Sequence, residues 1–197
     1  MLKFLAELCN KIFHCMNKYR ADPSSLGDYL MNEIKNITLT NKNNKEIPIY
    51  KGTYTLSVKD ELFIQVSNSL KTLDPLPPLK FVEELYLLPA DSNLKNKNAT
   101  AEEKAKAQKE KQIEDKANFK KLKSSFGEKF PKIKIFRHNM MNNDVEDSIV
   151  MQILTNFNGE NKTNERFFDF IFNENINYIG VSLAGKKAKK EGFIILA

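Results

Sequence analysis

The sequence has few of the residue types on which most catalytic and metal chemistry depends. Its 197 residues include two cysteines, two histidines, three arginines and no tryptophan. Cys9 and Cys15 lie six positions apart, which on a helix turns their side chains roughly 120° away from each other. No Cys-x-x-Cys spacing occurs, so the sequence excludes a disulfide-rich secreted scaffold and a cysteine-based zinc site. We therefore expect a reducing, cytoplasmic compartment.

The two histidines, His14 and His138, leave little room for general-base catalysis. His14 neighbours Cys15, but adjacent helix positions diverge by about 100°, so the two side chains are poorly placed to act as base and nucleophile. Gly-x-Gly-x-x-Gly, P-loop and His-Glu-x-x-His motifs are also absent from the sequence. We expect no enzymatic activity and no bound metal or cofactor.

Long apolar runs are missing as well. None approaches the roughly 20 residues that a membrane-spanning helix needs. Residues 2–13 are interrupted by Lys3, Glu7 and Lys11, and no small-residue cleavage site follows them. This pattern is not that of a secretory signal peptide, so we expect neither a membrane span nor a cleaved targeting segment.

The charge balance favours lysine heavily over arginine. Lys and Arg together number 31 against 25 acidic residues, which gives a formal net charge of +6. Proteins that read nucleic acids depend on arginine for bidentate contacts and interleave aromatic residues for stacking. This sequence has only three arginines, and its lysine-rich run is not interleaved with aromatic residues. We therefore expect no nucleic-acid partner, and the lysine excess indicates either attraction to an acidic protein surface or solubility.

The length and composition are those of one globular domain with a core of its own. Hydrophobic residues make up 41% of the chain and charged residues 28%. Residues 2–20 carry apolar side chains at three- and four-residue steps and predict an amphipathic helix. Asp22 followed by Pro23 predicts the start of a second helix, with the aspartate as its cap, which ends near residue 37.

The following segments predict alternating extended and helical structure. Residues 38–46 are polar and predict a loop, whereas residues 47–56 are rich in β-branched and aromatic side chains and predict a short strand or extended segment. Residues 57–60 resemble a capping box before a further helix. Residues 74–79 contain three prolines and must be extended, and residues 81–88 predict a short apolar turn or helix.

The last third of the sequence returns to a core pattern. Asp144 and Thr163 each predict a helix cap, the first before Ile149, Ile153 and Phe157 and the second before a Phe-rich helix. Residues 177–183 and 192–197 predict an antiparallel hairpin with residues 186–191 at its tip.

Residues 99–124 differ from the rest of the chain. Thr100 and Glu103 form a capping box, and the segment holds eight lysines, five acidic residues and few large apolar ones. This composition predicts a charged helical insertion without a broad buried face. It is either a solvated helix or a helix that docks on a partner. The candidate partner-binding residues are Lys109, Lys111, Ile113, Lys116, Phe119, Lys120, Lys121, Leu122 and Lys123.

Five segments carry a resemblance to a known family through their order and spacing: Asn17-Lys-Tyr-Arg-Ala21, Pro75-Leu-Pro-Pro-Leu79, Glu165-Arg-Phe-Phe168, Ile179-Gly-Val-Ser182 and Phe193-Ile-Ile-Leu196. Together they resemble the CAP superfamily of cysteine-rich secretory, antigen 5 and pathogenesis-related 1 proteins, in its protist form. The resemblance covers residues 14–90 and 126–197. It implies an α+β fold in which residues 1–197 form a single CAP-like three-layer α-β-α sandwich that contains the 99–124 insertion.

The same resemblance implies a degenerate cleft. The family holds a divalent cation with two histidines and two acids, a ligand set suited to zinc-like ions. Here the matching positions carry His138 where the family has an acid and Glu165 where it has a histidine, and no histidine follows Leu88 at the expected place. We expect no four-ligand site, and we interpret His138 as a surface or hydrogen-bonded residue.

Three functions are consistent with these patterns. The leading hypothesis is a non-enzymatic structural or scaffold subunit of a large intracellular assembly, with other protein subunits as its partners. A ciliary or microtubule-associated setting fits because tubulin surfaces are acidic. The alternatives are a CAP protein that binds a small apolar ligand such as a sterol or fatty acid, and a metal-dependent, hydrolase-like activity in the cleft.

Overall fold

The computed structural model describes residues 2–42, 45–56, 60–85, 100–142, 144–157, 166–186 and 189–197, and it is a mixed α+β structure as expected. The helices are α1 (Leu2–Ala21), α2 (Pro23–Glu33), α3 (Asp60–Leu70), α4 (Ala101–Phe126), α5 (Val145–Phe157) and α6 (Phe167–Ile171). The strands are β1 (Ile37–Lys42), β2 (Lys45–Tyr50), β3 (Tyr54–Thr55), β4 (Lys80–Phe81), β5 (Lys134–Met141), β6 (Tyr178–Lys186) and β7 (Lys189–Leu196).

A four-stranded sheet in the order β4-β6-β7-β5 forms the centre of the fold. The predicted hairpin is confirmed as β6 and β7, which pair antiparallel with Ile179 opposite Leu196. The strands continue to Lys186 and Lys189, so the hairpin turn is shorter than the predicted tip at 186–191. Strand β5 was not anticipated from the sequence; it pairs antiparallel with β7 and forms one edge of the sheet.

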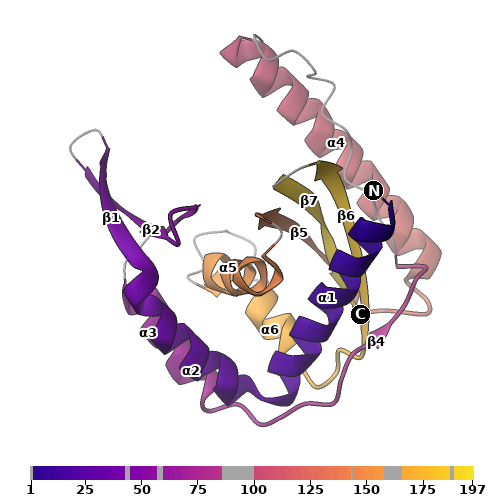
Figure 1. Ribbon diagram of the computed structural model, residues 1–197. Coiled ribbons are helices and arrows are strands. Elements are labelled where there is room, and N and C mark those ends of the chain that lie inside the picture. The colour runs from indigo at the N-terminus through magenta and orange to yellow at the C-terminus, as the bar shows by residue number, and fades with distance from the viewer. Residues whose placement is uncertain are drawn as a thin grey trace.

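Helices cover both faces of this sheet (Figure 1). Alternate residues of β7 enter two different cores because successive side chains of a strand point to opposite faces. Ile194 and Leu196 lie in the larger core with α1, α5 and α6. Phe193 and Ile195 lie in a smaller core on the α4 side. The sheet is thus the middle layer between α4 and the other helices.

A second, three-stranded sheet in the order β1-β2-β3 projects beside α2 and α3 (Figure 1). The loop predicted for residues 38–46 is wrong, because most of these residues form β1 and the start of β2. Side chains 38–41 are exposed. An exposed stretch of a hairpin does not need an apolar pattern, which is why the polar composition of residues 38–41 misled the prediction. The extended segment predicted for 47–56 is confirmed by β2 and β3.

The predicted helix starts that depend on local caps are confirmed. Asp22 accepts a hydrogen bond from the Ser25 amide at α2, and Asp144 Oδ1 accepts one from the Asp147 amide at α5. Helix α2 ends at Glu33 and continues as a 3-10 turn to Asn36, close to the predicted end.

The remaining predictions have mixed outcomes. Residues 74–79 lie outside any helix or strand, as expected of the proline-rich segment, while residues 80–81 form β4 and pair with β6. The predicted caps at residues 57 and 163 lie outside the described residues, as does the stretch 86–99.

Gly180 allows the segment after β4 to cross the sheet closely. A Cβ atom at this position would lie 1.9 Å from the carbonyl oxygen of Leu85, far inside van der Waals contact. The Leu85 side chain is buried in the α4-side core. The Ile-Gly-Val pattern of β6 therefore has a steric cause, since only glycine leaves room for this backbone approach.

Arg20 is the largest fully buried side chain of the described residues, and its recorded partners are carbonyl oxygens. Its Nε donates to Pro77 at 2.7 Å, and its two terminal nitrogens donate to Ile171 at 2.5 Å, Asn173 at 2.9 Å and Ile176 at 2.7 Å. A buried guanidinium is tolerated only when its donors are satisfied. The carbonyls at the end of a helix such as α6 lack intrahelical partners. The hydrogen bonds of Arg20 therefore pair its own buried donors and also the free carbonyl at the end of α6.

Asn17 makes a second tether from the same helix turn. Its side-chain amide donates to the Leu79 carbonyl at 3.2 Å and its oxygen accepts from the Leu79 amide at 2.8 Å. Because Asn17 and Arg20 lie three residues apart, they share one face of α1. The Asn-x-x-Arg pattern therefore holds the proline-rich segment to α1 and leads the chain into β4.

We predict that Arg20→Lys lowers the free energy of unfolding by about 3 kcal/mol or more, because an ammonium cannot reach the four carbonyls and leaves buried acceptors unpaired. Lys18→Met is the matched control: Lys18 pairs with Glu146 at the surface, so its loss should cost no more than about 0.5 kcal/mol. Urea unfolding measures both. An Arg20→Met variant as stable as the wild type would contradict the role assigned to Arg20.

Candidate functional site

Helix α4 is fixed to the sheet along one narrow face. The capping box of Thr100 and Glu103 is present, and the helix continues uninterrupted for 26 residues. Phe119 stacks edge-to-face on Phe193 of β7 with ring centroids 5.0 Å apart, and Leu122 is buried in the same core. These contacts fix the C-terminal part of α4 to the folded body, while its N-terminal part extends beyond the sheet (Figure 1).

Ion pairs extend this attachment beyond the apolar contacts. Asp115 accepts a hydrogen bond from Arg137 of β5, and Lys111 pairs with Glu191 of β7. Arg137 also lies 3.9 Å from Glu191. The Asp115 side chain is buried, so its pairing with Arg137 is the least solvent-screened of these contacts.

The opposite face of α4 carries four lysines and Glu110 around one exposed apolar residue. Ile113 is 68% exposed, the most exposed large hydrophobic side chain among the described residues. Lys106, Lys109, Lys116 and Lys120 are also exposed. They lie seven and four positions before Ile113 and three and seven positions after it, which places all five on the same helix face. We call this set the α4 outer face.

The structure divides the predicted partner-binding residues into three groups. Lys109, Ile113, Lys116 and Lys120 belong to the α4 outer face, and Lys121 and Lys123 are exposed beside it. Lys111, Phe119 and Leu122 instead face the sheet. The expectation that the three large apolar residues lie together on a docking surface is therefore wrong. Phe119 is six positions beyond Ile113, which turns it roughly 120° around the helix.

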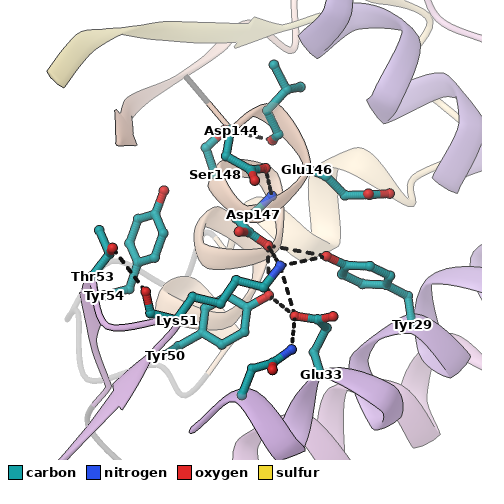
Figure 2. A network of polar contacts seen from close by, with 12 residues as sticks. Tyr29, Glu33, Tyr50, Lys51, Thr53, Tyr54, Asp144, Glu146, Asp147 and Ser148 are labelled. Atoms are coloured by element: carbon teal, nitrogen blue, oxygen red, sulfur yellow. Dashed lines mark hydrogen bonds and ion pairs between the residues drawn. The ribbon is translucent and has the colours of Figure 1, made fainter. Parts of the chain in front are cut away.

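A second constellation joins α2, the β2–β3 turn and the first turn of α5 (Figure 2). Asp147 Oδ1 accepts hydrogen bonds from Tyr29 at 3.2 Å, Tyr50 at 2.8 Å and Lys51 at 2.7 Å. Glu33 Oε2 lies 2.7 Å from the Tyr50 hydroxyl and 3.0 Å from Lys51 Nζ. We call these five residues the Lys51 cluster. Nothing local in the sequence indicated it, since its members come from three separate elements.

The backbone of the β2–β3 turn aims Lys51 at the two carboxylates. Lys51 and Gly52 have φ angles of 48° and 64°, and the Thr53 amide donates to the Tyr50 carbonyl. Two consecutive positive φ values close a hairpin in a type I′ turn. A lysine in this conformation is uncommon, and the two ion pairs of its side chain compensate for the strain.

The protonation states of the Lys51 cluster do not suit acid–base catalysis. Burial alone would lower the pKa of Lys51, but hydrogen bonds to Asp147 and Glu33 outweigh it and hold that pKa above the ordinary value. Burial opposes the ionised form of Glu33, but hydrogen bonds from Tyr50, Lys51 and Asn36 bring its pKa below the ordinary value. Burial and Asp147 raise the pKa of Tyr29 to about 12. These groups keep their usual neutral-pH charges, whereas a general base needs a pKa near the working pH.

His138 was interpreted as a surface or hydrogen-bonded residue; it is completely buried, so the surface alternative is wrong. It lies on β5 beside Phe136 and Met140, and among the described residues no partner meets hydrogen-bond geometry at either ring nitrogen. Burial lowers its pKa to about 4, opposed in part by the nearby Gln152 side chain. His138 is therefore neutral at physiological pH. Glu165, with which it was expected to share the cleft, lies outside the described residues.

The two cysteines are free thiols that are poor nucleophiles. Burial raises the pKa of Cys9 to about 11 and that of Cys15 to about 12, and only the thiolate form reacts. Among the residues that the structure describes, no group of three or more His, Cys, Asp and Glu side chains could hold a metal ion. In the same part of the chain, no helix is long and apolar enough to cross a membrane.

Comparisons with protein-family models, with curated proteins and with solved structures found no match for this chain. The resemblance to the CAP superfamily therefore rests on the sequence segments alone.

We predict that Lys51→Met lowers the free energy of unfolding by about 2 kcal/mol near neutral pH, because Glu33 and Asp147 lose their shared cation. The folded pKa of Glu33 lies below 4.5, so its contribution is present above that pH and is lost as the pH falls through the folded pKa. The folded pKa of Lys51 lies above 10.5, so its contribution is present below that pH and is lost as the pH rises through the folded pKa.

Urea unfolding across pH tests this linkage. The stability gap between wild type and Lys51→Met should be widest from about pH 6 to 9 and should narrow below about pH 4. Lys71→Met removes an exposed pair with Asp28 and should change stability by no more than about 0.5 kcal/mol at any pH. A gap that does not change with pH would show that the cluster contributes packing alone.

Proposed function

We propose that this chain is a non-enzymatic structural subunit of a larger protein assembly, which it joins through the α4 outer face. Its body would be a divergent CAP-type sandwich whose cleft no longer binds a metal. The layering of helices on both faces of the sheet and the anchoring roles of Asn17 and Arg20 are compatible with that family. The observation that carries the proposal is the exposed Ile113 within its row of four lysines.

The candidate catalytic groups of the described residues support a non-enzymatic role. His138 is buried and neutral, both cysteines are protonated, and Lys51 is neutralised by two carboxylates. These groups stabilise the fold or fill its interior. Activated catalytic groups instead have a pKa shifted toward the working pH and access to substrate.

The α4 outer face has the composition of a protein-binding surface for an acidic partner. Four lysines supply long-range attraction, which steers association but gives little affinity by itself. Ile113 supplies an apolar side chain at the centre of this surface, which a bound partner would remove from water. Because α4 is held to the sheet by Phe119, Leu122 and the Asp115–Arg137 pair, binding costs little ordering of the helix.

The partner that fits this surface is a folded protein with an acidic patch and a shallow apolar pocket. Microtubules are the acidic protein surface that we propose to test first, which would place the chain in a ciliary or cytoskeletal assembly. Binding of a small apolar ligand stays a prediction from the sequence resemblance alone.

We predict that the purified chain co-sediments with microtubules and that replacing Lys106, Lys109, Lys116 and Lys120 with Gln weakens this binding at least about tenfold, through loss of the charge contacts. The matched control replaces four exposed lysines elsewhere, Lys11, Lys35, Lys80 and Lys132, and so removes the same net charge. Its binding should change much less.

A second variant separates specific docking from general attraction. Ile113→Ser keeps every charge and should still weaken binding several-fold, because it removes the one apolar contact at the centre of the surface. Equal losses in the two lysine variants, with no effect of Ile113→Ser, would show that binding depends on net charge alone and would contradict the proposal. Raised salt should weaken binding of the wild type.

A further inference from the structure

Strand β1 presents an open sheet edge on the side of the molecule remote from α4 (Figure 1). Among the described residues, β1 pairs with β2 alone, and the β1–β2 hairpin projects from the body. An open edge is a template for pairing with another strand, and natural proteins usually block it.

Pro48 determines which backbone groups of β1 face outward. It lies opposite Leu39, has no amide hydrogen, and its carbonyl oxygen accepts from the Leu56 amide on the β3 side. The Leu39–Pro48 pair is therefore a non-hydrogen-bonded pair of the β1–β2 ladder. Because such pairs alternate along an antiparallel ladder, the amide and carbonyl groups of Leu39 and Asn41 point away from β2.

The two edges of the hairpin are protected unequally. The outer edge of β2 lacks an amide at Pro48 and is covered at Ile49 and Tyr50 by β3. These are the devices that prevent edge pairing. The outer edge of β1 has neither, and its residues 37–41 carry no charge. Leu39, at the middle of this edge, is 43% exposed.

We propose that the β1 edge pairs with the β1 edge of a second copy of this chain, in an antiparallel register centred on Leu39. In this register Leu39 lies opposite Leu39 of the other copy, and Ile37 lies opposite Asn41. The two Leu39 residues exchange a pair of hydrogen bonds, and each Asn41 amide donates to an Ile37 carbonyl. The Ile37 amide already donates to the Ile34 carbonyl and takes no part.

Charge and hydrogen-bond phase both favour this self-pairing. The residues with outward-facing groups on one strand meet those on the other. The Leu39 pair makes both of its hydrogen bonds, and each Ile37–Asn41 pair makes one, because the Ile37 amide is already bonded to the Ile34 carbonyl. Lys42 lies opposite Asn36 of the other copy, whereas parallel in-register pairing would place Lys42 beside Lys42 and is disfavoured. Stable protein interfaces bury about 1,200 Å² or more. The β1 edge is too short to bury that area, so we expect a weak, reversible dimer.

Disulfide trapping of the full chain tests the register. Leu39→Cys should form a cross-linked dimer under mild oxidation, because opposed residues of a hydrogen-bonded pair have Cα atoms about 5.5 Å apart, within the disulfide range. Thr38→Cys is the matched control: its two copies would lie about 8 Å apart, beyond that range. Oxidation of the wild type measures how much cross-linked dimer forms through the native Cys9 and Cys15. Cross-linking of Thr38→Cys as fast as that of Leu39→Cys would overturn the register.

Sedimentation equilibrium tests the association without a cross-link. The wild type should show a dimer fraction that increases with concentration, and Leu39→Lys should weaken it at least about tenfold by placing two lysines opposite each other. Thr40→Lys adds the same charge but faces Thr38, so it should dimerise nearly as the wild type does. A wild type that stays monomeric at all concentrations, without a Leu39→Cys cross-link, would overturn the proposal.

This proposal is independent of the proposed function. The variant with four α4 lysines replaced by Gln should dimerise as the wild type does, because α4 lies on the other side of the body. Loss of dimerisation in that variant would contradict pairing through β1 and would assign self-association to α4 instead.

Discussion

The buried guanidinium of Arg20 is the constraint on which the rest of the structure depends. When a charged guanidinium is removed from water, its N–H donors must be paired with fixed acceptors. Arg20 finds them in the carbonyl oxygens of the proline-rich segment and of the chain around the end of α6. This holds together α1, the entry to β4 and the turn that precedes β6. These contacts fix the relative positions of the segments that flank the central sheet and its two cores.

The same use of polar chemistry recurs across the described residues. The Lys51 cluster joins α2, the β2–β3 turn and α5 with two carboxylates that share one cation, and Asp115 joins α4 to β5 through Arg137. Each of these groups has a partner of opposite charge. What the body leaves available lies at its surface: the α4 outer face on one side and the β1 edge on another. We propose that these two surfaces are where other protein chains bind.

Local chemistry was predictable from the sequence, and long-range placement was not. The caps at Asp22, Thr100 and Asp144 act within three residues of the chain, so their sequence signals were sufficient. Strand β5 pairs with residues 48 to 62 positions away, and Lys51 reaches Asp147 across 96 positions. No local pattern reveals these contacts. The 3.6-residue period of an α-helix was enough to predict that Ile113 lies on a different face of α4 from Phe119 and Leu122. The expectation that the three lie together failed because apolar residues were grouped by type rather than by angle around the helix.

The central claim is that this chain works as a rigid, non-catalytic subunit bound to other proteins through α4. The most direct test is the sedimentation of the native protein in a gentle cell extract, compared with the variant in which the four lysines of the α4 outer face are replaced by Gln. We predict that the wild type sediments in a large complex that dissociates in high salt, while the variant sediments near its own mass of 22.7 kDa. A wild type found free at that mass, or a variant that stays in the complex, would contradict the account.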